Sequence, residues 1–180
     1  MHDTERGRGN PAPTELSRKE KKALKKELST DLKEIEARIA QDPQNADLHI
    51  EKGRVLGQLL QFGNPMAAMR YINSLKEAFQ TALELDPEHI GAHFGLGMMK
   101  FHTPQGFGGD LDGAIAHFEF VVDTVPANTL ETLLTEAHLM LGQSYNRKED
   151  TPQAIAHFEQ ALALDPTNAQ AKEALAELGG

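Results

Sequence analysis

Histidine is the residue of this sequence best suited to chemistry near neutral pH, because its imidazole exchanges protons and binds metal ions there. Three histidines recur four residues before a glycine. They are His49, His93 and His138, which precede Gly53, Gly97 and Gly142. A ladder of ligands is one interpretation, but recurrence in step with glycines favours a repeated packing position with half-buried, hydrogen-bonded rings. No Ser or Cys nucleophile motif stands beside His117 or His157, so we expect no catalytic residue.

A metal site is the next chemistry to consider, because His89 and His93 are four residues apart and would share a helical face. The residues between them are Ile90, Gly91 and Ala92, so the glutamate of the H-E-x-x-H motif is missing. No third ligand can be assigned. We therefore expect no specific metal site and no cofactor.

The stretch from His102 to Gly113, HTPQGFGGDLDG, is the most distinctive loop of the chain. Its glycines suit a phosphate cradle, but the lysine and the Ser/Thr of a P-loop are absent and Asp110 would repel an anion. The alternating carboxylates of an EF-hand are missing as well. We expect Asp110 to cap a helix that starts near Leu111 and Phe107 to fold back against the neighbouring helices.

Charge is distributed unevenly over the 180 residues, whose formal net charge is -9. Residues 1–30 are net +3, and the rest, with 10 basic and 22 acidic residues, is net -12. An acidic body argues against a nucleic-acid partner. The chain has no cysteine and no apolar run of membrane-spanning length. A cytoplasmic location is the simplest expectation, although an exported protein that has lost its signal would look the same.

The beginning of the chain divides into a tail and a helix. Residues 1–16 are polar and rich in Gly and Pro, which predicts a disordered tail, and residues 17–180 form a single domain. Ser17 and Glu20 form a capping box for a helix over residues 18–41, with a second capping signal near residues 29–31 where the helix is expected to jog. Its basic run could suit a membrane surface or a nucleic acid, but the interspersed Glu20 and Glu27 favour an ordinary solvated face. That run is Lys19, Lys21, Lys22, Lys25 and Lys26.

Four prolines in the rest of the chain stand where we expect helices to end. They stand in Asp42-Pro43, Asp86-Pro87, Val125-Pro126 and Asp165-Pro166. Between them we expect three helical hairpins, followed by a final helix over residues 169–178. Asn64-Pro65 predicts a long second helix in the first hairpin, and Thr151-Pro152 predicts a helix start capped by Thr151.

The third hairpin carries a spaced set of large and small residues. The set is Leu141, Gly142 and Tyr145, then Ala154, Phe158 and Ala161, then Pro166. This pattern resembles the tetratricopeptide repeat (TPR), and the resemblance extends over about residues 31–178. Leu75 and Lys100 depart from the pattern in the first two hairpins. The resemblance implies an all-α fold, a short right-handed α-solenoid of TPR-like hairpins with a capping helix at each end.

The resemblance also implies a concave, partner-binding surface lined by the first helices of the hairpins. The partner-binding residues expected there are Ile50, Arg54, Phe94, Met98, Phe101, Leu139, Gln143, Asn146 and Arg147, beside Asp47, Gly57 and Glu136. The Lys/Asn carboxylate clamp of chaperone-binding TPR proteins is absent. An open alternative is that Phe94 and Phe101 belong to the core.

A groove with this composition predicts a binding protein: an adaptor, assembly factor or subunit that holds a segment of a protein partner. The alternative is capture of a small ligand by the groove and the loop at residues 102–113. An enzyme is the third and least supported class. The partner's identity and the oligomeric state stay open.

Overall fold

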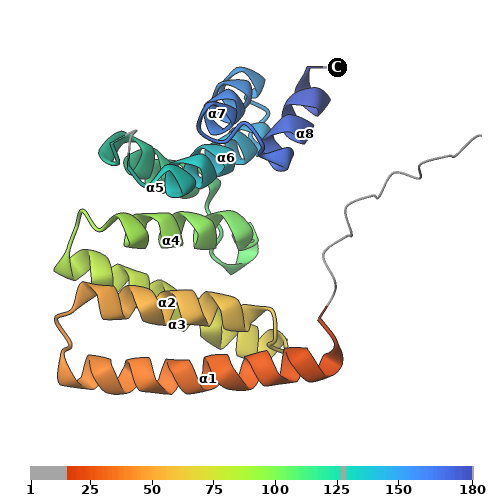
Figure 1. Ribbon diagram of the computed structural model, residues 1–180. Coiled ribbons are helices and arrows are strands. Elements are labelled where there is room, and N and C mark those ends of the chain that lie inside the picture. The colour runs from red at the N-terminus through yellow and green to blue at the C-terminus, as the bar shows by residue number, and fades with distance from the viewer. Residues whose placement is uncertain (1–15, 127–128, 180) are drawn as a thin grey trace, which may run out of the picture.

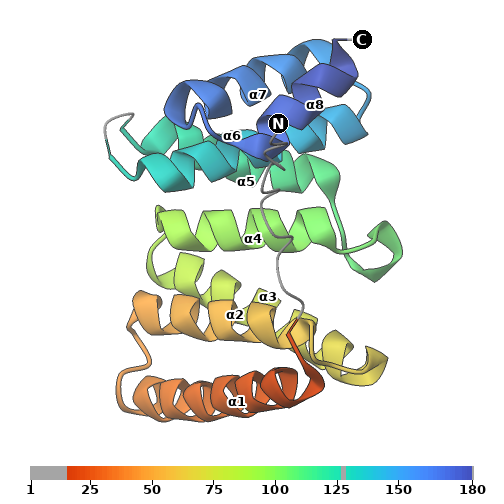
Figure 2. The ribbon, with the colours of Figure 1, turned by 45° about the vertical axis from the view of Figure 1, so that its right-hand side comes forward.

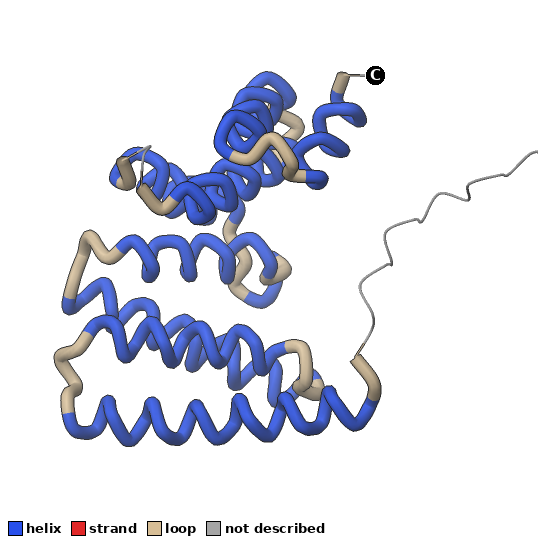
Figure 3. The backbone as a smooth tube through the Cα atoms, viewed as in Figure 1, coloured by secondary structure: helices blue, strands red, loops and turns tan. Residues whose placement is uncertain are grey.

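The computed structural model describes residues 16–126 and 129–179, and these ranges contain helices and turns but no strand (Figures 1 and 3). The helices are α1 (Arg18–Gln41), α2 (Ala46–Leu60), α3 (Pro65–Leu85), α4 (Ile90–His102), α5 (Leu111–Thr124), α6 (Glu131–Arg147), α7 (Thr151–Leu164) and α8 (Ala169–Leu178). A short 3-10 helix, η1 (Gln105–Phe107), lies between α4 and α5. The expected tail, except Leu16, falls outside the described residues.

The helices form hairpins that stack in chain order. Figures 1 and 2 show α2–α3, α4–α5 and α6–α7 in succession, with α1 against the first hairpin and α8 beside the last. This arrangement confirms the expected all-α, right-handed solenoid with a capping helix at each end. None of the described helices is long and apolar enough to cross a membrane.

Helix α1 begins as its capping box predicts. Ser17 Oγ accepts a hydrogen bond from Glu20 N at 3.3 Å, and Glu20 Oε2 accepts one from Ser17 N at 2.8 Å. The expected jog near residues 29–31 is wrong. The hydroxyls of Ser29 and Thr30 donate to carbonyl oxygens four residues earlier, so the helix keeps these side chains on its own surface and continues.

Of the two other capping residues predicted from the sequence, one is correct and one is wrong. Asp110 Oδ1 accepts from Gly113 N at 2.9 Å, which confirms Asp110 as the cap of α5. Thr151, however, is the first helical residue of α7 and not its cap. The cap is Asp150, whose carboxylate accepts from Gln153 N at 3.3 Å after a left-handed turn at Glu149 with φ 62°.

Helix lengths follow the expected departures from a regular repeat. Helix α3 has 21 residues, against 14 each for α5 and α7, because Asn64 caps it early. Helix α6 has 17 residues, against 13 for α4, so it carries about one extra turn at its start. Both expectations are confirmed.

One packing feature recurs in all three hairpins. A phenylalanine ring of the second helix lies against a glycine of the first, and an added Cβ would come within 2.4 to 2.7 Å of a ring atom. The pairs are Phe79 with Gly53, Phe118 with Gly97, and Phe158 with Gly142. Phe118 and Phe158 are at most 1% exposed, so these slots are the centre of the core. We call them the glycine slots.

Candidate functional site

A cavity of about 860 Å³ lies between α2, α3 and α4 and reaches the first half of α6, and we call it the groove. Its walls include four glycines: Gly53, Gly57, Gly91 and Gly95. Leu75 and Phe79 contribute from α3, and Phe94 and Met98 contribute from α4. The apolar wall of the groove is therefore built mainly by α2 and α4, which are first helices of hairpins, and by α3 between them.

The glycines of the groove differ in what a side chain would meet. A Cβ at Gly53 or at Gly95 would lie 2.4 Å from the Phe79 ring, so both positions must stay bare for this ring to fit. A Cβ at Gly57 would meet only Leu75 Cδ1, at an ordinary 3.5 Å. The absent side chain at Gly57 is thus not required by packing, and it leaves room in the groove.

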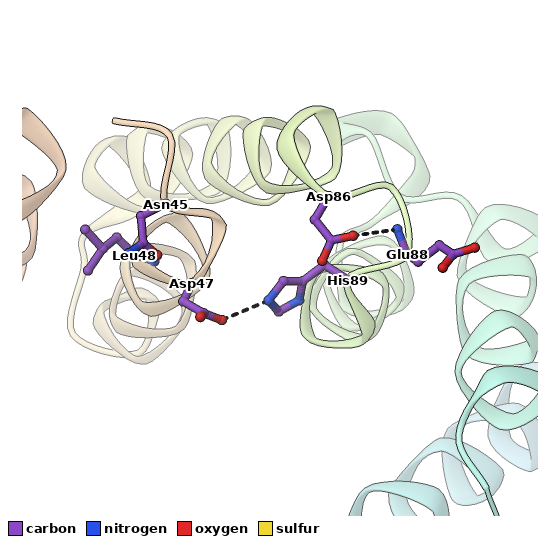
Figure 4. A network of polar contacts seen from close by, with 6 residues as sticks. All are labelled: Asn45, Asp47, Leu48, Asp86, Glu88 and His89. Carbon is purple, nitrogen blue, oxygen red and sulfur yellow. Dashed lines mark hydrogen bonds and ion pairs between the residues drawn. The ribbon is translucent and has the colours of Figure 1, made fainter. Parts of the chain in front are cut away.

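A polar network joins the starts of α2 and α4 at one end of the groove (Figure 4). His89 Nε2 donates to Asp47 Oδ1 at 3.0 Å, although the Asp47 side chain remains 83% exposed. His89 stands at the N-cap of α4, in a turn that Glu88 N supports by donating to Asp86 Oδ1 at 3.1 Å. The network holds the two helix ends together and leaves the carboxylate accessible.

Four of the sequence-predicted binding residues line the groove together. They are Ile50, Arg54, Phe94 and Met98, and Asp47, Gly57 and Glu136 line it as well. Arg54 is exposed, whereas Phe94 and Met98 are half-buried and Ile50 is 8% exposed. The structure therefore brings the predicted apolar centre together on α2 and α4.

Three predicted binding residues belong to the core, so their expected exposure is wrong: Ile50, which still lines the groove, and Phe101 and Leu139, which do not. For Phe101 the alternative of a core residue is therefore correct. Phe101 is 8% exposed and packs with Ile115 and Met140, and the Arg147 guanidinium lies 4.7 Å from its ring centroid. Leu139 is 7% exposed and belongs to a cluster with Phe158. The reason for Phe101 and Leu139 is that the following hairpin or helix covers a face that the resemblance leaves open.

The remaining three predicted residues lie away from the groove. Gln143 is half-buried, Asn146 is exposed, and neither lines the groove. Arg147 Nη1 donates to the Phe101 carbonyl oxygen at 2.8 Å, so this side chain ties α6 to α4. The groove therefore reaches the third hairpin at Leu133 and Glu136, in the first half of α6, but not at Gln143, Asn146 and Arg147.

Sequence reasoning missed part of the groove. Ile72, Leu75 and Phe79 line it from α3, and Thr103 and Pro104 line it from the loop that follows α4. The signal for the α3 contribution was present, because Leu75 replaces a small residue of the repeat pattern. No local signal distinguished Thr103 and Pro104, whose place depends on how the loop turns.

That loop is held by its own backbone. Gly109 N donates to Pro104 O and Asp110 N to Lys100 O, each at 3.1 Å, and Lys100 Nζ lies 2.7 Å from Asp110 Oδ2. The hydrogen bond from Lys100 lowers the pKa of the Asp110 carboxyl below its usual range. Phe107 is 60% exposed, so the expectation that it folds back is wrong, because these bonds close the loop without the ring.

The aligned histidines form two pairs outside the groove. The Nδ1 atoms of His93 and His117 lie 3.1 Å apart, and those of His138 and His157 also lie 3.1 Å apart. Burial, followed by the neighbouring imidazole, lowers the pKa of His117 and of His138 to about 4. The rings are half-buried and hydrogen-bonded, which confirms the packing interpretation over a ladder of ligands.

His89 and His93 turn to different partners, Asp47 and His117, so they do not face a common ion. Among residues 16–126 and 129–179, no group of three or more His, Cys, Asp or Glu side chains is placed to hold a metal ion. His49 bonds to backbone, with its Nε2 lying 3.0 Å from Pro43 O.

Comparisons with known proteins agree with this architecture. Residues 135–168 match the family model described as tetratricopeptide repeat. The chain is 32% identical over 112 residues to the protein CTR9 homolog of Arabidopsis thaliana, a match that covers 62% of this chain and only 9% of that protein.

Solved structures show the same fold. MamA superimposes with a TM-score of 0.66 at 17% identity, covering 92% of this chain and 84% of that chain. A thermophilic TPR protein of Thermus thermophilus gives a TM-score of 0.65 at 16% identity, covering 89% of this chain and 76% of that chain. At identities of 17% and 16%, the likeness shows a shared fold and nothing further.

Proposed function

Because the chain is a tetratricopeptide-repeat protein, we propose that it is a protein-interaction module that holds a segment of a partner protein in the groove. The groove's composition is the observation that supports this function. Phe94 and Met98 pack against the core cluster around Phe118 and keep a half-exposed apolar face in the groove. Gly57, where packing would tolerate a Cβ, leaves the groove wall bare. Apolar surface gathered in a cleft is typical of binding sites.

Charged groups at the groove supply the polar part of such a site. Asp47, Arg54 and Glu136 are exposed around the apolar residues. In protein interfaces a buried apolar centre contributes most of the affinity, and the rim sets orientation and excludes wrong partners. The groove has this division, with its centre on α4 and its charges on α2 and α6.

A small apolar ligand is the second candidate, and the volume of the groove favours it. About 860 Å³ lies within the range of roughly 300 to 1,000 Å³ that small-molecule sites occupy. Thr103 and Pro104 bring the loop after α4 to the groove, so the loop would take part. Catalysis has less support, since the paired imidazoles lie outside the groove and bond to each other.

The experiment is to fill the groove without disturbing the fold. Gly57→Leu places a side chain in the groove at a position where a Cβ is tolerated, and it replaces the poorest ordinary helix former with a good one. Met98→Glu places a charge at the apolar centre. Against a partner captured by the wild-type protein and identified by mass spectrometry, both variants are expected to lose at least about tenfold in affinity, or about 1.4 kcal/mol.

Titration calorimetry measures the affinities, and circular dichroism checks that each variant is folded. Glu159→Ala is the control, because Glu159 is exposed on α7, far along the chain from the groove. Unchanged affinity in folded Gly57→Leu and Met98→Glu proteins would overturn the proposal. A small apolar probe that displaces the partner from the wild-type protein only would favour the second candidate.

A further inference from the structure

We propose that the segment held in the groove is basic as well as apolar, with Lys or Arg side chains set against Asp47 and Glu136. This inference rests on the proposed function and specifies its partner. The register of the repeats places both carboxylates at equivalent positions. Asp47, Gly91 and Glu136 each stand two residues before the recurring histidine of their helix, so they occupy the same position on α2, α4 and α6.

The two carboxylates therefore lie on either side of a residue without a side chain. Asp47 and Glu136 both line the groove, and so does Gly91 between them in the stack. A Cβ at Gly91 would meet His89 Cε1 at 3.2 Å and Ile50 Cγ2 at 3.4 Å, so this position is closely walled by its neighbours. The start of the groove thus has an acidic group on each flank and a bare helix face in the middle.

Both carboxylates remain available to a partner. The Asp47 side chain is 83% exposed, and the hydrogen bond from His89 uses Oδ1. Glu136 is exposed and takes part in no ion pair among the described residues. An ammonium or guanidinium group that approaches them gains a charge-assisted hydrogen bond while its alkyl stem lies along the apolar surface of α4.

Arg54 is the positive group that distinguishes the two ends of the groove. It follows Asp47 by seven residues on α2, which is about 10 Å along the helix. Asp47 lies at the start of α2, Glu136 lies at the equivalent repeat position of α6, after the extra turn of that helix, and the guanidinium lies further along α2. A basic side chain is favoured at the start and is repelled near Arg54, so the inference assigns a position as well as a charge.

The charge of the chain after residue 30 acts in the same direction. Residues 31–180 have 10 basic and 22 acidic side chains, which is a net charge of -12. A field of this sign attracts basic segments from solution and raises the rate at which they associate. An acidic segment, and a nucleic acid likewise, would approach against this field.

The test is selection from random peptides. Helix α4 has 13 residues and is about 20 Å long, which an extended chain spans with about six residues, so peptides of about twelve residues are long enough. A phage-displayed library of this length is panned on the full chain, and the enriched peptides are synthesised and measured by fluorescence anisotropy. We expect apolar peptides enriched in Lys and Arg relative to the unselected library.

Variants then locate the basic side chains. Glu136→Lys is expected to weaken the enriched peptides at least about tenfold, and Asp47→Asn, which can still accept from His89, about threefold. Raised salt is expected to weaken wild-type binding and to leave the variants less affected. The matched control is Glu159→Lys on α7, which introduces the same charge change at an exposed site of another helix.

The outcomes separate this inference from the proposed function. Enriched peptides that are neutral or acidic, or that bind the Glu136→Lys variant unchanged, would overturn the inference of a basic partner. If those peptides lose binding in Gly57→Leu, the groove would still be supported as the binding site. Peptides indifferent to Gly57→Leu and Met98→Glu, or a library that yields no binder, would count against both.

Discussion

The first and second hairpins each have a glycine slot, but they differ one helical turn after it. Gly57 follows the slot glycine Gly53 by four residues, and Phe101 follows Gly97 by the same interval. At Gly57 the surface stays open and forms part of the groove. At Phe101 a ring occupies the position, is 8% exposed and lies under Arg147. The slot glycine therefore serves the fold, and the residue one turn on decides whether the surface is open or closed.

A second difference concerns the residue before the slot ring. His117 precedes Phe118 and His157 precedes Phe158, and each pairs with a histidine of the first helix. Ala78 precedes Phe79, so the first hairpin has no such pair. The first hairpin is thus packed without a histidine at this position, whereas the two hairpins after it contain paired imidazoles in contact.

The largest expected effect tests what all the hairpins share. Phe158 is 1% exposed and fills the slot at Gly142, so Phe158→Ala leaves a cavity in the core. We expect a loss of about 3 to 5 kcal/mol in the free energy of unfolding, measured by urea denaturation. Glu159→Ala, at the adjacent exposed residue, is the control and should be nearly neutral. A loss below about 1 kcal/mol would contradict the slot as the centre of packing.

The next effect tests the difference in histidines. The pKa of His117 and of His138 is lowered to about 4 in the folded chain, so the unfolded chain binds more protons between pH 6.5 and pH 4. Stability therefore falls as pH falls through this window. We expect a loss of about 2 kcal/mol between pH 7 and pH 5, since half-exposed rings retain part of their solvation.

Charged groups around these rings modify the pKa shifts. Asp110 opposes the lowered pKa of His117 and Lys100 adds to it, and Glu119 opposes the lowered pKa of His157. The double variant His117→Gln/His138→Gln, which removes both rings whose pKa is lowered to about 4, should show a flatter dependence of melting temperature on pH. Equal slopes in the wild-type protein and this variant would refute the assignment to the pairs.

The smallest expected effect tests the contrast between the two glycines of α2. Gly57→Ala meets only Leu75 at 3.5 Å, so it should raise the free energy of unfolding by about 0.5 to 1 kcal/mol through helix propensity. Gly53→Ala puts a Cβ 2.4 Å from the Phe79 ring and should lower it. Thermal melts of the two variants measure both changes, and shifts of the same sign would remove the distinction between slot and groove.

The fold was largely predictable because its signals are local. The capping box at Ser17 and the prolines at helix ends predict elements from residues next to one another, and the bounds of α1 and α8 agree with the prediction. Thr151 failed because a capping side chain depends on the backbone turn before it, here at Glu149, and both Asp150 and Thr151 can cap.

The groove was predictable only in part. Phe94 and Met98 follow from their shared helical face, but the burial of Phe101 depends on Arg147, 46 residues later, and that of Leu139 on the cluster around Phe158. Periodicity within one helix identifies an apolar face; it does not identify which neighbour covers that face. The exposure of Phe107 was not predictable from its local sequence either, because backbone hydrogen bonds close the loop without its ring.

Phe79 has a consequence for how the chain unfolds. Its ring lies within 2.4 Å of the Cβ positions of both Gly53 and Gly95, so one side chain fills the slot of its own hairpin and the junction with the next. In repeat proteins, stability is approximately a sum of intrinsic repeat energies and nearest-neighbour interface energies. The Phe79 ring contributes to both terms at once. We therefore expect the first two hairpins to unfold together, with the groove between them present only while both are folded.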